Sequence, residues 1–308
     1  MKAFLKLIRW PNLLIILLSM TLIAFFIIKP GLGLSFRAGM SPAAFGLLVV
    51  AVLFTAMGGY VLNDLKDLQA DAVNKPGKNV FESHFSVLTG KKLYWVFTLT
   101  GVVAGTVLSQ WYGNISFSLI FILTAGLLWF YAERYQCQTL VGNLVVAFLS
   151  ALSFGLVWLF EVMALQEQHL SVDPVRLYLV NDLVLIYMGF AFLVSLLREV
   201  VKDMEDERGD RAAGCLTLPV SHGLQKAKNV ALAVNLTGLL ASIAIQWFFY
   251  QWHFTLLFFS FFLVDLLFSF VLLKLLRANG SQQFHFVSLW IKILMVTGIL
   301  TMTLFYFE

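Results

Sequence analysis

Long apolar runs alternate with short polar stretches along the whole chain. A helix needs about 20 predominantly apolar residues to cross the hydrocarbon core of a bilayer. Runs near that length cover residues 11–29, 43–62, 92–111, 115–132, 140–160, 178–198, 228–250, 253–275 and 286–306. This pattern predicts an all-α integral membrane protein, a bundle of nine transmembrane helices. Because flexible linkers and low-complexity tracts are missing, we expect residues 1–308 to form a single domain.

The composition agrees with a chain that lies mostly within lipid. Of its 308 residues, 60% are hydrophobic and only 12% are charged, whereas soluble domains carry about 25% charged residues. The formal net charge of +4 is therefore no sign of nucleic-acid binding. We expect membrane lipids, and no nucleic acid, among the partners of this protein.

The first apolar run has two interpretations. Lys2, Lys6 and Arg9 precede it, and positive charge before an apolar stretch is also found in signal peptides. The run is long for a signal peptide, however, and no convincing cleavage site follows it. We therefore interpret it as the first membrane helix.

The distribution of lysine and arginine predicts how the bundle is oriented. With the N-terminus in the cytoplasm, 17 of the 21 basic residues fall on the cytoplasmic side. Only Lys29, Arg37 and Arg176 fall outside, and Lys292 lies within the last run. By the positive-inside rule, the N-terminus is cytoplasmic and the C-terminus is outside. Short loops and the lack of a targeting extension favour a prokaryotic inner membrane.

Two acidic segments follow the second and the sixth apolar run. Each has three carboxylates spaced i, i+3, i+7: Asp64, Asp67 and Asp71 in the first, Asp203, Asp206 and Asp210 in the second. On a helix this spacing places all three on one face, where like charges repel unless a cation lies among them. Both segments fall on the predicted cytoplasmic side. We therefore expect Mg²⁺ to bind there and to hold a diphosphate.

Basic residues stand close to both acidic segments. They are Lys75 and Lys78 after the first segment, and Arg198, Lys202 and Arg211 around the second. Carboxylates that bind Mg²⁺ beside cations that bind phosphate oxygens are typical of a diphosphate site. Charge runs at the ends of membrane helices are more often only solvated faces. The repeated spacing argues against that simpler interpretation here.

Turn-forming residues follow the carboxylates of each segment. Asn74-Lys75-Pro76-Gly77 stands after the first, and Gly209 with Gly214 stands in and after the second. We therefore expect each segment to continue or cap the preceding membrane helix, with the chain turning soon afterwards.

Two cysteines and two ionisable residues also stand out in the sequence. Cys137 and Cys215 lie in or beside predicted cytoplasmic segments, so we expect free thiols, and no Cys/His cluster has the spacing of a metal site. Asp265 and Lys292 stand inside apolar runs, where ionisable groups are costly. Each could form a structural polar pair between helices or have a functional role, and we assign neither residue to the site.

The two acidic segments resemble the signature motifs of the UbiA superfamily of intramembrane prenyltransferases. The first reads Asn63-Asp64-Leu65-Lys66-Asp67-x-x-x-Asp71, with Asn74-Lys75-Pro76 after it. The second reads Arg198-Glu199-Val200-Val201-Lys202-Asp203-Met204-Glu205-Asp206-Glu207-Arg208-Gly209-Asp210, then Gly214-x-x-Thr217-Leu218-Pro219-Val220. Arg9-x-Pro11-Asn12 is similar to the N-terminal pattern of the family, and Gly142-Asn143 with Tyr131 is a weaker match. The resemblance spans the whole chain.

The resemblance implies a Mg²⁺-dependent transfer of a prenyl group. The metal ligands would be Asp67, Asp71, Asp206 and Asp210. Residues that support them would be Asn63, Asp64 and Asp203. The prenyl diphosphate would be bound by Lys75, Lys78, Arg198 and Lys202. Tyr131 would face the carbocation by a cation–π contact, and Asn12 would contact the acceptor or the diphosphate.

The resemblance also bears on the substrates. It implies a prenyl diphosphate with a geranylgeranyl or longer chain as donor, and a lipophilic or amphiphilic acceptor. The form Lys-Asp-x-Glu-Asp-x-x-Gly-Asp over residues 202–210 resembles the branch that prenylates geranylgeranylglyceryl phosphate to make ether lipids. That acceptor is favoured over an aromatic precursor of menaquinone or ubiquinone type. A chlorophyll- or haem-type acceptor is less favoured.

The sequence departs from the family pattern at two places. Gln136 stands where members often have a lysine, and Arg134 is a candidate to supply the missing charge. Lys75-Pro76 and Lys78 stand where many members have Arg-Pro pairs, and lysine lacks the bidentate fork of arginine. These departures concern diphosphate binding and specificity rather than the class of reaction.

Three rival functions are weighed against this one. A cation-coupled transporter or channel would carry carboxylates deep within its spans, whereas here they cluster at helix ends. A chain-elongating prenyl synthase of the soluble type also uses paired aspartate motifs, but nine spans argue against it. A member that has lost activity is disfavoured by intact aspartates in both motifs.

Overall fold

The computed structural model describes residues 1–74, 77 and 79–308. Within these residues, nine helical segments are long and apolar enough to cross a membrane, so the nine predicted runs are confirmed. Their bounds are Trp10–Leu32, Pro42–Lys66, Val87–Trp111, Ile115–Glu133, Val141–Glu167, Pro174–Ala212, Leu224–Gln251, Thr255–Arg277 and Ser281–Phe307. Most extend beyond the apolar runs by several residues, because polar residues at the ends continue the helical hydrogen bonding.

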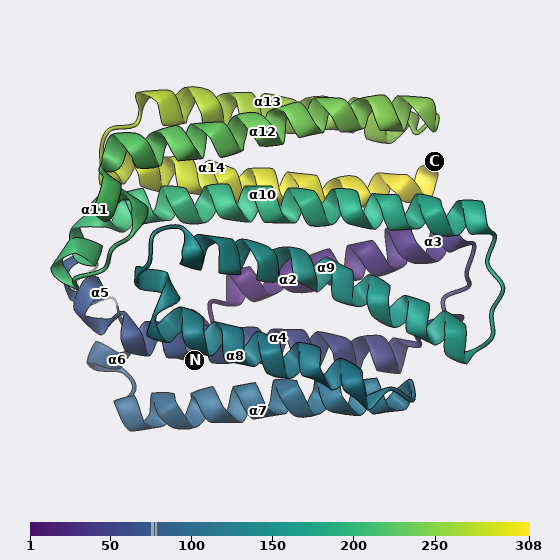
Figure 1. The fold of residues 1–308 in the computed structure, drawn as a ribbon, viewed down its shortest axis with the longest axis horizontal. Coiled ribbons are helices and arrows are strands. Elements are labelled where there is room, and N and C mark those ends of the chain that lie inside the picture. Colours follow the sequence, from purple (N-terminus) through teal and green to yellow (C-terminus); the bar gives the residue numbers. More distant parts are fainter. Residues whose placement is uncertain (75–76, 78) are drawn as a thin grey trace.

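The long helices lie side by side along the longest dimension of the molecule (Figure 1). Three short helices, α5 (Leu68–Asn74), α6 (Val80–Ser83) and α11 (Leu218–His222), gather at one end. The connection between α9 (Val141–Glu167) and α10 (Pro174–Ala212) lies at the other end, as does the C-terminus. Both acidic segments therefore lie at the same end of the bundle.

The helix α10 is longer than a membrane span requires. Its 39 residues extend over about 58 Å at 1.5 Å per residue, against about 30 Å for the hydrocarbon core. Asp173 caps its start by accepting a hydrogen bond from the backbone N–H of Val175 at 3.0 Å. Gly214, with a φ of +74°, takes the chain out of the helix after its end at Ala212. The second acidic segment forms the last turns of this helix, as predicted.

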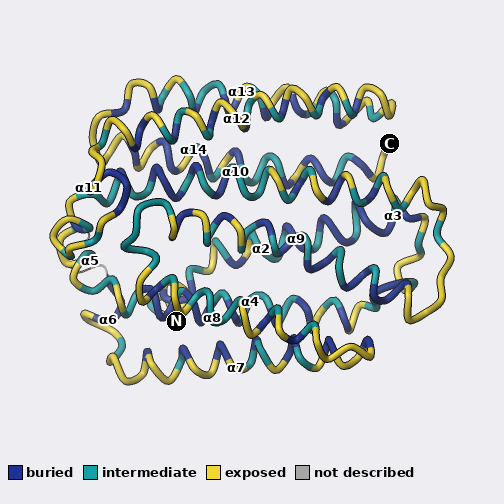
Figure 2. Tube along the Cα trace, in the orientation of Figure 1, coloured by how far each residue is buried: buried dark blue, intermediate teal, exposed yellow. Residues whose placement is uncertain are grey.

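Burial follows the inward faces of the long helices, and exposed positions follow their outer faces (Figure 2). Many exposed side chains are large and apolar, such as Leu123, Trp247 and Phe259, as expected for surfaces that face lipid. Small residues let α4 (Pro42–Lys66) and α7 (Val87–Trp111) pack closely. A Cβ on Gly101 would lie 2.3 Å from Thr55 Oγ1.

Cys137 and Cys215 form a disulfide bond, so the prediction of free thiols is wrong. Cys137 ends the short 3₁₀ helix Tyr135–Cys137, and Cys215 follows α10. The backbone N–H of Leu216 donates to the Cys137 carbonyl at 2.9 Å and holds the two segments together. Because 78 residues separate the cysteines, their contact depends on packing that their sequence neighbourhoods do not show.

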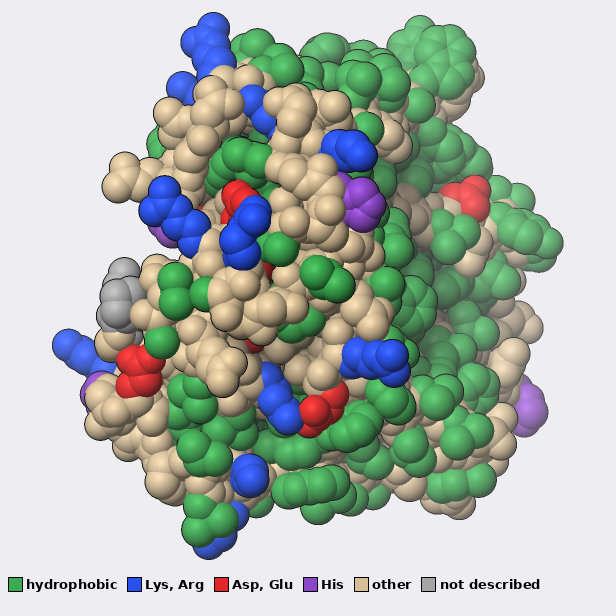
Figure 3. All heavy atoms as spheres, turned by 60° about the vertical axis from the view of Figure 1, so that its left-hand side comes forward, with side chains coloured by type: hydrophobic (Ala, Val, Ile, Leu, Met, Phe, Trp, Pro, Cys, Tyr) green, Lys and Arg blue, Asp and Glu red, His purple; other side chains and the backbone are tan. Residues whose placement is uncertain are grey.

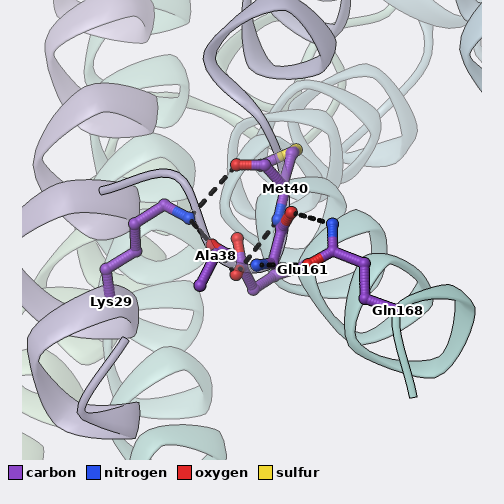
Figure 4. A network of polar contacts seen from close by, with 6 residues as sticks. Lys29, Ala38, Met40, Glu161 and Gln168 are labelled. Atoms are coloured by element: carbon purple, nitrogen blue, oxygen red, sulfur yellow. Dashed lines mark hydrogen bonds and ion pairs between the residues drawn. The ribbon is translucent and has the colours of Figure 1, made fainter. Parts of the chain in front are cut away.

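A buried polar network closes the end of the bundle opposite the acidic segments (Figure 4). Lys29 Nζ and Glu161 Oε1 lie 3.5 Å apart, and both side chains are at most 5% exposed. Lys29 donates to the Met40 carbonyl at 3.1 Å, and Glu161 accepts from the Met40 N–H at 3.2 Å. The Gln168 side chain bonds to Gly39 at 2.7 and 3.0 Å. These bonds fix the connection before α4 against α9.

Candidate active site

The first acidic segment is not one continuous helix. The helix α4 ends at Lys66, Asp67 lies at the junction, and α5 begins at Leu68. The Asn63 amide donates to the Asp67 carboxylate, a local bond of the kind that competes with regular helix geometry. The prediction of a single helix that carries all three carboxylates is therefore wrong for this segment. It is confirmed for the second segment, which lies entirely within α10.

The other two carboxylates of the first segment have partners from elsewhere in the chain. Arg9 Nη2 lies 2.6 Å from Asp64 Oδ1 in an ion pair. The Asn79 amide donates to Asp71 Oδ2 at 2.9 Å and to the Asp64 carbonyl at 3.0 Å. Asp64 thus faces the start of α2 (Trp10–Leu22), while Asp71 is oriented by the residue that caps α6.

Two carboxylates of the second segment are also oriented by donors from other elements. The Asn143 amide of α9 donates to Asp203 Oδ2 at 2.8 Å. The Thr217 hydroxyl, before α11, donates to Asp210 Oδ2 at 3.1 Å. Each bond uses one carboxylate oxygen and fixes the direction of the other. Asn143 was only a weak part of the sequence resemblance, and Thr217 had no assigned role.

Asn74, at the end of α5, joins the two acidic segments. Its amide group donates to the Asp206 carbonyl at 2.9 Å and accepts from the Gly209 N–H at 2.8 Å. A Cβ on Gly209 would lie 2.2 Å from Asn74 Nδ2 and 2.6 Å from the Ala70 carbonyl. Gly209 therefore lies inside α10 and permits this close approach. The prediction that it forms a turn is wrong, whereas Gly214 does end the helix.

A cavity of about 260 Å³ leads from this end into the bundle. The predicted site residues Asn12, Asn63, Tyr131, Arg198 and Lys202 all line it. Its lining on α10 runs from Tyr187 to Lys202, which is about 22 Å along the helix axis. The deeper part is apolar and is lined by Phe121, Phe154, Phe190, Phe261 and Phe268, among others. The cavity therefore has a polar end beside the carboxylates and a long apolar interior.

At the polar end of the cavity, the described lining includes the basic side chains of Arg198 and Lys202 but only one carboxylate, that of Glu199. Arg198 Nη1 bonds to Glu199 Oε1 at 2.5 Å. Lys202 has neither a hydrogen bond nor an ion pair within the part of the chain that the structure describes. Charged side chains of both signs gather over this end of the molecule, while the flank is apolar (Figure 3). Such a surplus favours an anionic ligand.

The electrostatic state of Asp67 shows how closely the carboxylates are grouped. Burial raises the pKa of Asp67 to about 6. The positive charges of Lys202 and Arg9 act against this rise, whereas the carboxylates of Asp71 and Asp64 add to it. A cation bound among these carboxylates would favour the ionised form of Asp67.

Among the described residues, the carboxylates form no complete cage for a metal ion. Over residues 1–74, 77 and 79–308, no three Asp, Glu, His or Cys side chains converge on one point. Mg²⁺ usually takes only one or two carboxylates and fills its remaining positions with water and phosphate oxygens. Oxygen donors from two facing segments, fixed by Asn74, suit that mode of binding.

Other predicted residues have different outcomes. Lys75 and Lys78 lie outside the described residues. Arg134 is exposed and does not line the cavity. Asn74 was expected in a turn and in the first family motif, and Asn79 had no assigned role. Their signal in the sequence was their place directly after the first carboxylates, where an amide can bond to neighbouring backbone.

Comparisons with known proteins bear on the whole chain. The UbiA prenyltransferase family matches residues 17–296. A digeranylgeranylglyceryl phosphate synthase from Methanothermobacter thermautotrophicus is 33% identical over 198 residues, which is 64% of this chain and 62% of that protein. The chain thus spans less than two thirds of that relative's length.

Solved structures share the fold. A structure described as giving structural and mechanistic insights into digeranylgeranylglyceryl phosphate synthase in membranes has a TM-score of 0.64 and 24% identity. The match covers 98% of this chain and 96% of that chain. A UbiA homologue from Archaeoglobus fulgidus, bound to DMAPP and Mg²⁺, has a TM-score of 0.61 and 14% identity. The match covers 97% of this chain and 99% of that one.

Proposed function

The chain belongs to the UbiA prenyltransferase family, and we propose that it transfers a prenyl group from a prenyl diphosphate to a lipophilic acceptor, with Mg²⁺. One observation carries this proposal. Asn74 joins the two acidic segments at the polar end of an apolar cavity. That arrangement supports the binding of a diphosphate at one end of a space suited to an isoprenoid tail.

We assign the metal to four carboxylates. Asp67 and Asp71 from one segment, and Asp206 and Asp210 from the other, would hold Mg²⁺. When bound, Mg²⁺ would neutralise the diphosphate and favour cleavage of the allylic C–O bond. Support comes from the Archaeoglobus fulgidus homologue, whose structure contains Mg²⁺ and DMAPP. Asn63, Asp64 and Asp203 would orient the ligands and the helix ends that carry them.

The cations at the polar end would stabilise the leaving group. Lys202 and Arg198 line the cavity, and we propose that they bind the departing diphosphate together with Lys75 and Lys78. Fixed charges of this kind lower the barrier because they are oriented before the bond breaks. Tyr131 would face the allylic cation. The apolar walls would keep water away from that cation until the acceptor attacks.

We propose a glyceryl phosphate bearing a geranylgeranyl chain as the acceptor, and geranylgeranyl diphosphate or a longer prenyl diphosphate as the donor. The name of the Methanothermobacter thermautotrophicus relative supports this choice, as does the form of the second motif. Transfer to an aromatic quinone precursor is the alternative within the family, and Asn12 would then contact the ring. The deep phenylalanines of the cavity suit either tail.

We further propose a membrane location for the active site and a single domain for the chain. The charge distribution along the chain supports an active site on the cytoplasmic side of a prokaryotic inner membrane. The cavity is lined from the start of α2 to Met302, near the end of the last span. This shared lining supports a single domain over residues 1–308.

An acceptor screen tests the proposed function. Purified protein in nanodiscs is given radiolabelled geranylgeranyl diphosphate, Mg²⁺ and one acceptor: geranylgeranylglyceryl phosphate, 4-hydroxybenzoate or 1,4-dihydroxy-2-naphthoate. Each reaction has a parallel with EDTA. We expect labelled product with the glyceryl phosphate alone, abolished by EDTA. Product only with an aromatic acceptor would replace the proposed acceptor, and no Mg²⁺-dependent binding of the donor would reject the function.

A further inference from the structure

Lys292 is a charged side chain with no assigned partner in the interior of the bundle. It lies on α14 (Ser281–Leu300) and lines the cavity. Within the described part of the chain it has no hydrogen bond and no ion pair. An ionisable group inside a membrane span is costly unless it is paired or serves a ligand. The cavity is therefore the place to look for its counter-charge.

Two contacts between α10 and the last span, Ser281–Phe307, fix the depth of Lys292. His285 Nδ1 lies 2.9 Å from Glu205 Oε1, and the Tyr187 hydroxyl lies 3.0 Å from Thr301 Oγ1. Between these two contacts the residue number rises from 285 to 301 on the last span and falls from 205 to 187 on α10. The two helices are therefore antiparallel. By this register Lys292 lies level with Arg198, another residue that lines the cavity.

The nearest carboxylates on α10 are bonded to other groups. Glu199 accepts a hydrogen bond from Arg198 at 2.5 Å. Glu205 faces His285, and its backbone carbonyl accepts from the Ser281 hydroxyl at 2.9 Å. Lys202, one turn nearer to the acidic segments, is a further cation. At the depth of Lys292, the cavity thus has two basic side chains and one carboxylate that is already bonded.

Lys292 lies level with Arg198, at the deep edge of the space that the diphosphate would occupy. Asp206 is eight residues from Arg198, or about 12 Å along α10. A diphosphate held at the acidic segments would meet Lys202 first. The carbon of the donor that accepts the nucleophile would then lie deeper in the cavity, towards Arg198 and Lys292. The anion that Lys292 would pair with therefore belongs to the acceptor.

We propose that Lys292 binds the phosphate of the acceptor, and so selects phosphate-bearing acceptors over neutral ones. This inference rests on the proposed function. In a glyceryl phosphate, the attacking hydroxyl and the phosphate belong to the same small glycerol unit. The phosphate must then lie close to the reacting carbon, at the depth where Lys292 and Arg198 both line the cavity. An ammonium group is a point charge that suits a phosphate monoester.

Three variants test this role. Lys292→Gln removes the charge, Lys292→Arg retains it, and Lys274→Gln is the matched control. Lys274 lies on α13 (Thr255–Arg277), contacts the rings of Phe270 and Phe286, and does not line the cavity. Each variant is assayed with geranylgeranylglyceryl phosphate, with geranylgeranylglycerol, which lacks the phosphate, and with varied geranylgeranyl diphosphate.

We expect Lys292→Gln to raise the KM for the phosphorylated acceptor on the order of 10–100-fold, the loss typical of one charged hydrogen bond. The KM for the donor and the rate with geranylgeranylglycerol should change little. Lys292→Arg should restore most of the affinity, and Lys274→Gln should match the wild type. Direct binding of the phosphorylated acceptor, measured calorimetrically without donor, should weaken by the same factor.

Each other outcome has a defined meaning. If the wild type is active and Lys292→Gln leaves the KM for the phosphorylated acceptor unchanged, the inference is overturned. The proposed function would remain supported. A raised donor KM with an unchanged acceptor KM would place Lys292 at the diphosphate and also overturn it. A wild type that prenylates no glyceryl phosphate would reject the proposed function, and the inference with it.

Discussion

At the scale of single residues, most site carboxylates have a partner from another part of the chain. Asn79 bonds to Asp71, Asn143 to Asp203 and Thr217 to Asp210. Each donor occupies one oxygen and fixes the orientation of the side chain. Such supporting bonds tune a metal site by holding its ligands before the metal binds. The partner of Asp64 is a cation instead of a neutral donor. Its carboxylate pairs with Arg9 and faces the start of α2.

Removing a metal ligand should abolish turnover. We expect Asp67→Ala and Asp206→Ala each to lower kcat/KM more than about 100-fold, since charge stabilisation at the leaving group is lost. Initial rates with purified protein measure the effect, and size-exclusion chromatography in detergent shows whether the variants remain folded. Glu207→Ala is the matched control, because Glu207 pairs with Arg211 on α10. Wild-type rates for Asp67→Ala would refute the metal assignment.

At the scale of elements, the site depends on how closely α5 approaches α10. The approach is possible because Gly209 has no side chain at the point where Asn74 and the Ala70 carbonyl meet α10. The two bonds of Asn74 then hold the first acidic segment opposite the second. The distance between the segments is therefore set by helix packing, and a methyl group is enough to change it.

Gly209→Ala should impair the enzyme, whereas Gly189→Ala should not. Both glycines lie in α10, but a Cβ on Gly189 would have no atom within 4 Å. We expect Gly209→Ala to lower kcat/KM on the order of 10–100-fold, as for the loss of a residue that orients metal ligands. Helix propensity alone would favour alanine at both positions by up to about 1 kcal/mol. Equal activities of the two variants would contradict the role of Gly209.

The network at the opposite end predicts a change in stability rather than in activity. Glu161→Ala leaves the Lys29 charge buried without its counter-charge, which typically destabilises a protein by about 3–5 kcal/mol. We expect a lower Tm in detergent and nearly unchanged kcat/KM well below that Tm. The control is Glu167→Ala, at the exposed end of the same helix. An unchanged Tm for Glu161→Ala would show that the pair adds no stability.

At the scale of the whole molecule, helices from the whole length of the chain surround one cavity. Its lining includes Asn12 near the N-terminus, Tyr131 in the middle and Met302 near the C-terminus. Neither half of the bundle encloses the apolar interior alone. The reacting groups at the polar end are therefore shielded from water only when all parts are packed together.

An odd number of spans predicts termini on opposite sides of the membrane. We expect the N-terminus in the cytoplasm and the C-terminus outside, because basic residues gather on the side of the acidic segments. Alkaline phosphatase fused after Glu308 should be active, and green fluorescent protein at the same position should be dark. Fluorescent fusions at both termini would contradict this topology.

The sequence by itself determined the class of fold and the main chemistry. The spans follow from apolar length alone, because backbone in lipid must satisfy its own hydrogen bonds and so becomes helical. The aspartate spacing and the family resemblance pointed to the carboxylates, and Asn12, Asn63, Tyr131, Arg198 and Lys202 do line one cavity. These features are local, or repeat at a period that a helix imposes.

The tertiary structure decided which distant residues meet. The Cys137–Cys215 bond, the bridge made by Asn74 and the close approach at Gly209 join segments that are far apart in the chain. The tertiary structure also decided two further features. They are the break of the first segment at Asp67 and the position of Lys292 at the level of Arg198. They depend on the packing and register of whole helices, which side-chain spacing within one segment does not specify. Long-range contacts of this kind arise only when the bundle closes.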